Sequence, residues 1–364
     1  SGILHPDCHC LIGGGVVADL AGLFRELSEL YKRGIGWEDR LFFSVSAHLV
    51  LPYHRLVEQA DERALGKDKI GTTLRGIGPA YSDKMARRGV RMGELFDHDK
   101  LVAKLQHVID AHRAKIETLP DVEIPDAESV ATELQEYGAQ LKPYLVNTSE
   151  YLHGRMAAGK RILFEGAQGA LLDIDFGTYP FVTSSTTTIG GIMTGLGVGP
   201  CSVDRVVGVT KAYCTRVGAG PFPTELTDEL GEKLREQGNE FGATTGRPRR
   251  CGWVDAVLLG YTSRINGVTD LAVTKLDVLD GLDALQICTG YKGHTGPLDL
   301  AHLDGVQPIY EAWPGWQEST VGISDYDQLP AECRRYLDRL AEIAGARLHI
   351  VSTGPRRDQT IRIN

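Results

Sequence analysis

The chain has 364 residues, 42% of them hydrophobic and 24% charged, and its formal net charge at pH 7 is −9. This length and hydrophobic content are enough for a large buried core. The acidic balance argues against general binding of nucleic acid or of an anionic membrane, because both reward clustered positive charge. A local cluster of arginines would still suit a small anion.

Short apolar, β-branched runs alternate with helical patterns along the chain. The predicted elements, in chain order, are a helix at 101–119, strands at 161–166, 205–210 and 271–275, a helix at 336–344 and a strand at 347–351. This alternation predicts an α/β fold with a mostly parallel central sheet and flanking helices. No shift in composition marks a boundary, so we expect a single domain over residues 1–364.

The cysteine pattern bears on the compartment. The seven cysteines are odd in number and mostly scattered, which suits reduced thiols better than a disulfide framework. No apolar run is long enough to span a bilayer. We therefore expect a cytoplasmic protein with no membrane segment. His5, Cys8, His9 and Cys10 are metal-binding residue types, but their crowding suits no common zinc spacing.

Ligands of parallel sheets usually bind at the carboxyl ends of the strands, so residues that follow each predicted strand are candidates. Thr274-Lys275-Leu276-Asp277 ends one such strand. A carboxylate at Asp277 could accept the N1 and N2 protons of guanine, a pair that adenine does not offer, and a lysine stem could lie over the flat base. The alternative is an ordinary strand end, because Lys-x-Asp is a common pattern there.

A basic cluster lies at 242–250. Arg247, Arg249 and Arg250 offer planar forks of donors that match phosphate and carboxylate oxygens, and Thr244 and Thr245 add hydroxyl donors. Three arginines in four residues of an acidic chain favour an anion clamp. The alternative is a solvated basic turn.

Two further loops are candidate ligand contacts. The stretch 70–79 combines glycines with Thr72 and Thr73, so its backbone and hydroxyls could approach phosphate, but it has no lysine in the Walker position. Gln168 follows the predicted strand at 161–166 and is a candidate donor. A structural loop and a buried, satisfied glutamine are the respective alternatives.

Taken together, these motifs resemble adenylosuccinate synthetase, in that family's order from end to end. The matching stretches are 71–81, 83–89, 164–173, 179–185, 213–226, 239–253, 274–281 and 352–355. The resemblance implies a P-loop-NTPase-like synthetase fold. It also implies GTP-dependent ligation of IMP and L-aspartate to adenylosuccinate, with release of GDP and phosphate and with Mg²⁺ as cofactor.

The resemblance assigns site residues position by position. The matches to the family's IMP contacts are Thr73, Gln168, Thr183 and Arg247, with Arg87 reaching the IMP of the partner subunit in a homodimer. The aspartate-binding loop matches Ala243, Thr244, Thr245, Gly246, Arg247, Pro248 and Arg249. The GTP contacts match Arg249, Lys275, Leu276, Asp277, Ser352, Thr353 and Gly354.

The resemblance also places the family's phosphate loop, its catalytic Asp (a magnesium ligand) and its catalytic His upstream of Ser1, together with the first strand of the sheet. We therefore expect no catalytic residue and no metal ligand within residues 1–364. Two alternatives to an ordinary synthetase stay open. One is a non-catalytic short form that binds nucleotide or a partner subunit, and the other is a relative that acts on a different purine nucleotide.

Overall fold

The computed structural model describes residues 2–66, 71–242, 246–293 and 298–363, apart from the side chains of residues 201 and 301. Its internal contacts fall into two compact units. The first unit comprises residues 1–169 and 183–202, and the second comprises residues 170–182 and 203–364. The single domain expected over residues 1–364 stays a prediction.

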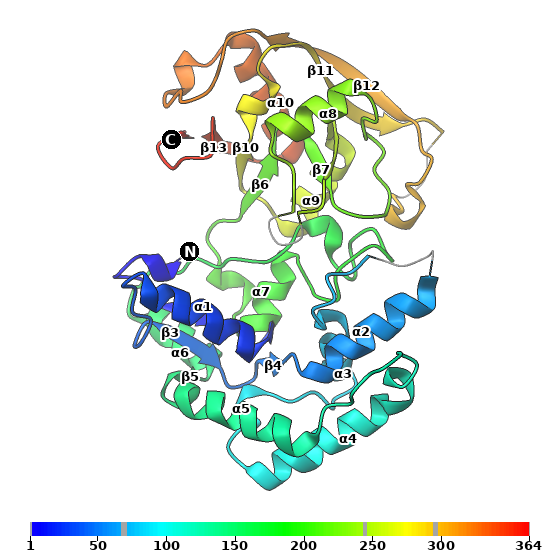
Figure 1. The fold of residues 1–364 in the computed structure, drawn as a ribbon. Helices are drawn as coiled ribbons and strands as arrows, with labels where there is room; N and C mark the ends of the chain where they lie inside the picture. Colours follow the sequence, from blue (N-terminus) through cyan, green and yellow to red (C-terminus); the bar gives the residue numbers. More distant parts are fainter. Residues whose placement is uncertain (1, 67–70, 243–245, 294–297, 364) are drawn as a thin grey trace. The chain divides into compact units, whose positions relative to one another are not determined.

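The first unit combines helices with two small parallel sheets (Figure 1). The three-stranded sheet has the order β1 (Cys10–Ile12), β3 (Leu41–Ser44), β5 (Leu145–Val146), and the two-stranded sheet pairs β2 (Val17–Ala18) with β4 (His48–Leu49). The helices of this unit are α1 (Leu20–Lys32), α2 (Pro52–Leu65), α3 (Ile77–Met85), α4 (His98–Ile116), α5 (Ala127–Leu141), α6 (Thr148–Ala157) and α7 (Ile189–Leu196).

Helix α4 confirms the helix predicted at 101–119, although it begins earlier and ends at Ile116. It starts after Asp97, whose side chain caps the helix by accepting a hydrogen bond from the backbone N–H of Lys100. Leu101, Leu105 and Val108 recur at helical spacing on its buried face, which packs against α5. These residues belong to the hydrophobic core of the first unit.

The second unit contains the sheet on which the nucleotide prediction depends. Its strand order is β14 (Thr360–Arg362), β13 (Arg347–Ser352), β10 (Asp270–Thr274), β6 (Val207–Lys211). The strands β6, β10 and β13 are parallel, and β14 pairs antiparallel with β13. The strands predicted at 205–210, 271–275 and 347–351 are therefore confirmed within two residues at each end.

The rest of the second unit packs around that sheet. Its other strands are β7 (Cys214–Arg216) paired with β8 (Arg250–Gly252), and a sheet of the order β12 (Pro308–Trp316), β11 (Leu282–Tyr291), β9 (Val254–Asp255). Its helices are α8 (Glu229–Gln237), α9 (Ala256–Asn266) and α10 (Ala331–Ala344). Helix α10 confirms the prediction at 336–344 and contacts β10, β12 and β13. Tyr336, Leu337 and Leu340 on its inner face are fully buried.

One predicted strand is wrong. Residues 161–166 form no strand, and the Leu163 side chain is 89% exposed. An apolar run becomes a strand only when a neighbouring strand satisfies its backbone hydrogen bonds, and none pairs with it among the described residues. No helix in the described part of the chain is both long and apolar enough to cross a bilayer.

Candidate functional site

The carboxyl ends of three parallel strands meet at one edge of the four-stranded sheet. Lys211 ends β6, Lys275 follows β10, and Ser352 ends β13. The register pairs Thr274 with Lys211, and the Thr274 hydroxyl donates a hydrogen bond of 3.1 Å to the carbonyl of Thr210. This edge is where ligands of parallel sheets usually bind, and it collects the residues predicted to contact GTP.

Asp277 lies just beyond this edge, in a 3-10 helix at Leu276–Leu279. Lys275 precedes that helix in the left-handed backbone region, with a φ of 62°. The Asp277 Oδ1 atom is buried, and no described residue donates a hydrogen bond to it. Burial raises the pKa of this carboxyl above its usual value. Because a buried, unpaired acceptor costs about 1–3 kcal/mol, this atom is suited to a ligand donor.

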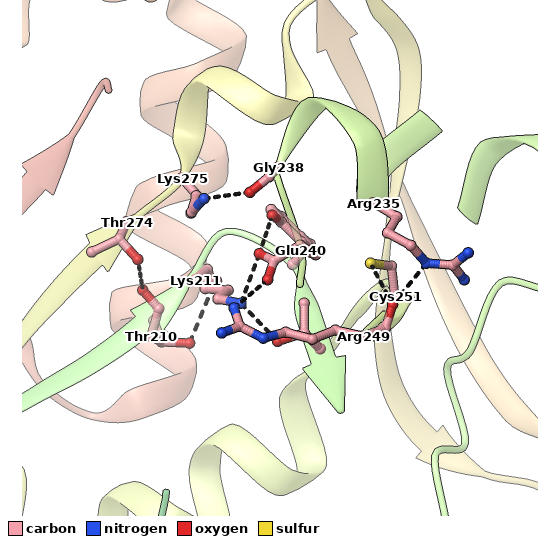
Figure 2. Close-up of polar contacts among 11 residues, drawn as sticks. Thr210, Lys211, Arg235, Gly238, Glu240, Arg249, Cys251, Thr274 and Lys275 are labelled. Atoms are coloured by element: carbon pink, nitrogen blue, oxygen red, sulfur yellow. Dashed lines mark hydrogen bonds and ion pairs between the residues drawn. The ribbon is translucent and has the colours of Figure 1, made fainter. Parts of the chain in front are cut away.

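Glu240 lies at the centre of a polar network that includes the half-buried Lys211 and Arg249 (Figure 2). Its side chain is fully buried. Oε1 accepts hydrogen bonds from Lys211 Nζ at 2.7 Å and from the Tyr213 hydroxyl at 2.6 Å, and Oε2 accepts one from Arg249 Nη1 at 2.6 Å. Burial by itself raises the pKa of the Glu240 carboxyl, but the hydrogen bonds from Lys211, Tyr213 and Arg249 outweigh it and the pKa lies below its usual value.

The arginine cluster divides into three different environments. Arg249 pairs with Glu240, and Arg250 pairs with Glu225. The Arg247 side chain is exposed. Its carbonyl accepts a hydrogen bond of 2.8 Å from the backbone N–H of Gly242. Arg249 and Arg250 are thus held by carboxylates of the chain, a feature that the composition of the cluster alone did not reveal.

The predicted aspartate-binding loop is only partly described. Ala243, Thr244 and Thr245 lie outside the described residues. Gly246 has a φ of 64°, in the region that favours glycine, and Pro248 forms an isolated bridge with Phe241.

The segment predicted to contact GTP after β13 is tightly bonded within the unit. Ser352 donates a hydrogen bond of 2.8 Å to the carbonyl of Gly354. Thr353 is fully buried, and its hydroxyl donates to the carbonyls of Ile323 and Gln359. The Thr353 side chain therefore serves the turn itself. Leu276, also among the predicted contacts, is fully buried in the hydrophobic core.

Four residues predicted to contact IMP lie in the first unit. Thr73 is exposed and precedes α3, while Gln168 is exposed with a φ of 62°. Thr183 is half-buried. The segments that contain Gln168 and Thr183 are joined by a hydrogen bond of 2.9 Å from the Thr187 hydroxyl to the carbonyl of Gly169. The fifth predicted residue, Arg247, belongs to the second unit.

Arg87 projects from a turn that is built on a buried aspartate. Asp83 is fully buried, and its backbone carbonyl accepts hydrogen bonds from the N–H groups of Arg88 and Gly89. The Asp83 carboxylate accepts hydrogen bonds from Arg88 Nε at 2.7 Å, His112 Nε2 at 2.9 Å, His54 Nε2 at 3.1 Å and the Tyr53 hydroxyl at 2.6 Å. Arg87 itself has a φ of 63°, is exposed, and its guanidinium pairs with none of the described residues.

Of the metal-binding residue types near the amino terminus, His9 contacts a tyrosine. His9 Nδ1 lies 2.9 Å from the Tyr151 hydroxyl. Among the described residues, no three His, Cys, Asp or Glu side chains are grouped as a metal site.

The family model for adenylosuccinate synthetase matches residues 1–361. The chain belongs to the adenylosuccinate synthetase family. It is 50% identical, over 99% of its length, to adenylosuccinate synthetases of Pseudomonas putida (strain W619) and Pseudomonas aeruginosa (strain LESB58), and it covers 85% of each relative. The family's reaction is the GTP-dependent ligation of IMP and L-aspartate to adenylosuccinate. As a member of this family, the chain is a purine-nucleotide ligase.

Solved structures agree with this fold. The structure of fully ligated adenylosuccinate synthetase from Plasmodium falciparum aligns with a TM-score of 0.90 at 34% identity, covering 100% of this chain and 87% of that one. The succinoaminodeoxyadenylate synthetase PurZ of cyanophage S-2L aligns with a TM-score of 0.58 at 20% identity, covering 99% of this chain and 78% of that one. The second likeness shows the fold alone. The predicted family and the α/β fold are confirmed.

Sequence reasoning missed Glu240, Lys211 and Tyr213, which form the hydrogen-bonded network at the strand edge. Two signals could have found part of it. Lys211 directly follows the strand predicted at 205–210, and Glu240 is an acidic residue close to a basic cluster. The Asp83 cluster was also missed, because its tyrosine and histidine partners lie 29 and 30 positions away in the chain.

Proposed function

We propose that this chain binds GTP at the carboxyl edge of the four-stranded sheet, with Asp277 reading the guanine base. The observation that supports this proposal most directly is the buried Asp277 Oδ1, which no described residue satisfies. A carboxylate accepts both the N1 and N2 protons of guanine, and adenine would leave it unpaired at a large cost. Lys275, which precedes Asp277 on a left-handed backbone, supplies an aliphatic stem for the face of the base.

We propose that Arg249 completes the GTP site as a cation fixed in place by Glu240. The Arg249 guanidinium has five N–H donors, and Glu240 takes the one described on Nη1. The remaining donors suit the anionic or carbonyl oxygens of the nucleotide. Ser352 and Gly354 contribute the turn at the end of the neighbouring strand β13.

We propose that Thr73, Gln168, Thr183 and Arg247 contact IMP, and that Arg87 contacts the IMP of a partner subunit in a homodimer. Arg87 is exposed, its backbone is held by the Asp83 turn, and its guanidinium pairs with none of the described residues. An arginine presented in this way is suited to a phosphate supplied by another molecule. The loop at 243–249 is proposed to bind aspartate, whose carboxylates would match Arg247.

Magnesium is part of the proposal only through family membership. Mg²⁺ is commonly held by one or two carboxylates together with phosphate oxygens. At the strand edge Glu240 already accepts three donors, and Asp277 is assigned to guanine. These two carboxylates therefore do not fit a magnesium site, and we assign no residue of the chain to the ion. Loss of turnover on chelation with EDTA would support the cofactor.

The chain's own residues have a clear task in the reaction, which we propose proceeds by phosphorylation of the O6 of IMP and displacement of that phosphate by the aspartate amine. They orient the three substrates and place cations where negative charge develops. The catalytic Asp and His that the resemblance places upstream of Ser1 stay a prediction. A cytoplasmic location also stays a prediction, and it rests on the cysteine pattern.

Isothermal titration calorimetry with GDP and ADP tests the nucleotide site without turnover. We expect GDP to bind at least about 100-fold more tightly than ADP, the order of discrimination produced when a buried polar group is left unpaired. Equal affinities would overturn the assignment of Asp277. Adenylosuccinate formation from IMP, aspartate, GTP and Mg²⁺, followed by ultraviolet absorbance, is the second measurement. Guanine-selective binding without turnover would favour the non-catalytic, nucleotide-binding alternative.

A further inference from the structure

We propose that Glu240 is a positioning residue for the nucleotide site, which holds the Arg249 guanidinium in its binding orientation. The inference rests on the proposed GTP site. Glu240 is fully buried and accepts hydrogen bonds from three side chains, which come from two segments of the chain. Lys211 ends β6, Tyr213 follows it, and Arg249 directly precedes β8.

Arg249 is held by Glu240 through both its main chain and its side chain. The backbone N–H of Arg249 donates to the Glu240 carbonyl at 2.8 Å, and Nη1 donates to Oε2 at 2.6 Å. On the other side, Arg235 Nε donates to the Arg249 carbonyl at 2.9 Å. An arginine whose main chain is fixed at both its N–H and its carbonyl, and whose fork is fixed by a carboxylate, loses little further rotamer freedom when a ligand binds.

The same segment is joined to the turn proposed to read guanine. Lys275 Nζ donates a hydrogen bond to the carbonyl of Gly238, two residues before Glu240, as Figure 2 shows. Gly238 in turn lies against Tyr213, because a Cβ atom at position 238 would meet the Tyr213 hydroxyl at 2.2 Å. That hydroxyl is the one bonded to Glu240. Lys275, Gly238, Tyr213 and Glu240 therefore form one packed connection between the guanine turn and Arg249.

The charges around Glu240 do not cancel. One carboxylate faces Lys211 and Arg249, and Lys275 lies close enough that it lowers the pKa of Lys211, although burial is the larger cause of that shift. The excess positive charge suits an anionic nucleotide. If Glu240 lost its charge, Lys211 and Arg249 would repel each other without a shared partner, and the Arg249 fork would turn away.

A double-mutant cycle with Arg249→Ala separates positioning from general stability. Glu240→Gln keeps the shape of the side chain and removes its charge. We expect it to weaken GDP binding about tenfold or more, the size expected when one charge-assisted hydrogen bond is lost. In the Arg249→Ala background, Glu240→Gln should have no further effect on GDP affinity, because the residue acts through Arg249. The affinity for IMP alone should stay unchanged in the Glu240→Gln variant.

Asp270 provides the matched control. It is also a buried carboxylate that accepts from two arginines, Arg205 and Arg347, but it lies at the opposite end of β10. Asp270→Asn should lower the melting temperature without changing GDP affinity. If Glu240→Gln behaves like Asp270→Asn, or if its effect on GDP binding is the same with and without Arg249, the proposal is overturned.

The outcomes also separate this inference from the proposed function. Should the wild-type chain fail to distinguish GDP from ADP, the proposed GTP site itself is wrong. Should it distinguish them while Glu240→Gln binds GDP normally, only the role of Glu240 is wrong. If Glu240→Gln does not fold, Tyr213→Phe decides the question. It removes one donor and keeps the ring, and we expect severalfold weaker GDP binding; an unchanged affinity would overturn the proposal.

Discussion

Replacing Asp277 by asparagine should have opposite effects on nucleotide binding and on the nucleotide-free protein. The substitution keeps the size of the side chain but removes the charge that would accept the two guanine protons. Hydrogen bonds to a charged group contribute about 1.5–3 kcal/mol. Loss of one such bond should therefore weaken GDP binding about 10- to 150-fold.

The nucleotide-free protein should not lose stability. Burial raises the pKa of the Asp277 carboxyl, so its ionised form disfavours folding at neutral pH. For a carboxyl whose folded pKa is raised, this destabilisation is present above the folded pKa and disappears as the pH falls below the unfolded value of about 4. At pH 7 the asparagine variant should consequently melt at the same temperature as the wild type or higher.

Calorimetry with GDP and with inosine diphosphate, which lacks the N2 amino group, provides the assay. In the wild type GDP should bind more tightly than inosine diphosphate, because the second proton of the pair is missing from inosine. In Asp277→Asn that difference should shrink. A variant that keeps both its affinity for GDP and its preference over inosine diphosphate would refute the reasoning, as would a large loss of melting temperature, since the buried Oδ1 would then have a structural partner.

Three further predictions concern other parts of the chain. Arg87→Ala should weaken IMP binding but leave the melting temperature unchanged, because the side chain is exposed. Titration with IMP, combined with sedimentation to determine the oligomeric state, tests this prediction. An unchanged affinity for IMP in a dimeric protein would exclude the contact with the partner. The pKa of Asp83 lies far below its usual range: burial alone raises it, and hydrogen bonds from histidine, tyrosine and arginine side chains outweigh burial. The stability it contributes is therefore present above the unfolded pKa of about 4 and is lost as the pH falls toward the folded pKa. The difference in unfolding free energy between wild type and Asp83→Asn, measured with urea from pH 7 to pH 3, should be constant above about pH 5 and should begin to shrink below about pH 4. Gly238→Ala should destabilise the protein by about 1–3 kcal/mol and weaken GDP binding, because its Cβ would collide with the Tyr213 hydroxyl. Gly154→Ala in α6 should not destabilise the protein, because a Cβ there meets nothing within 4 Å. Equal melting temperatures for the two variants would contradict this packing.

The sequence predicted the elements whose pattern is local. Helices α4 and α10 show apolar residues at helical spacing, and β6, β10 and β13 are short apolar runs bounded by turn residues. The boundaries moved by a few residues, since caps such as Asp97 and Pro330 decide where a helix begins. The run at 161–166 has the same composition but is not a strand, because a strand also needs a partner and the run itself does not encode one.

The residues of the candidate site were likewise predicted only in part from the sequence. Residue types at strand ends pointed to Lys275 and Asp277, because the edge of a parallel sheet is a ligand-binding position whatever the rest of the fold. Only the tertiary structure decided that Arg249 pairs with Glu240 and Arg250 with Glu225, and that the Asp277 Oδ1 is buried without a described partner. Ion pairs and burial join residues that no periodicity relates, so they depend on the path of the folded chain.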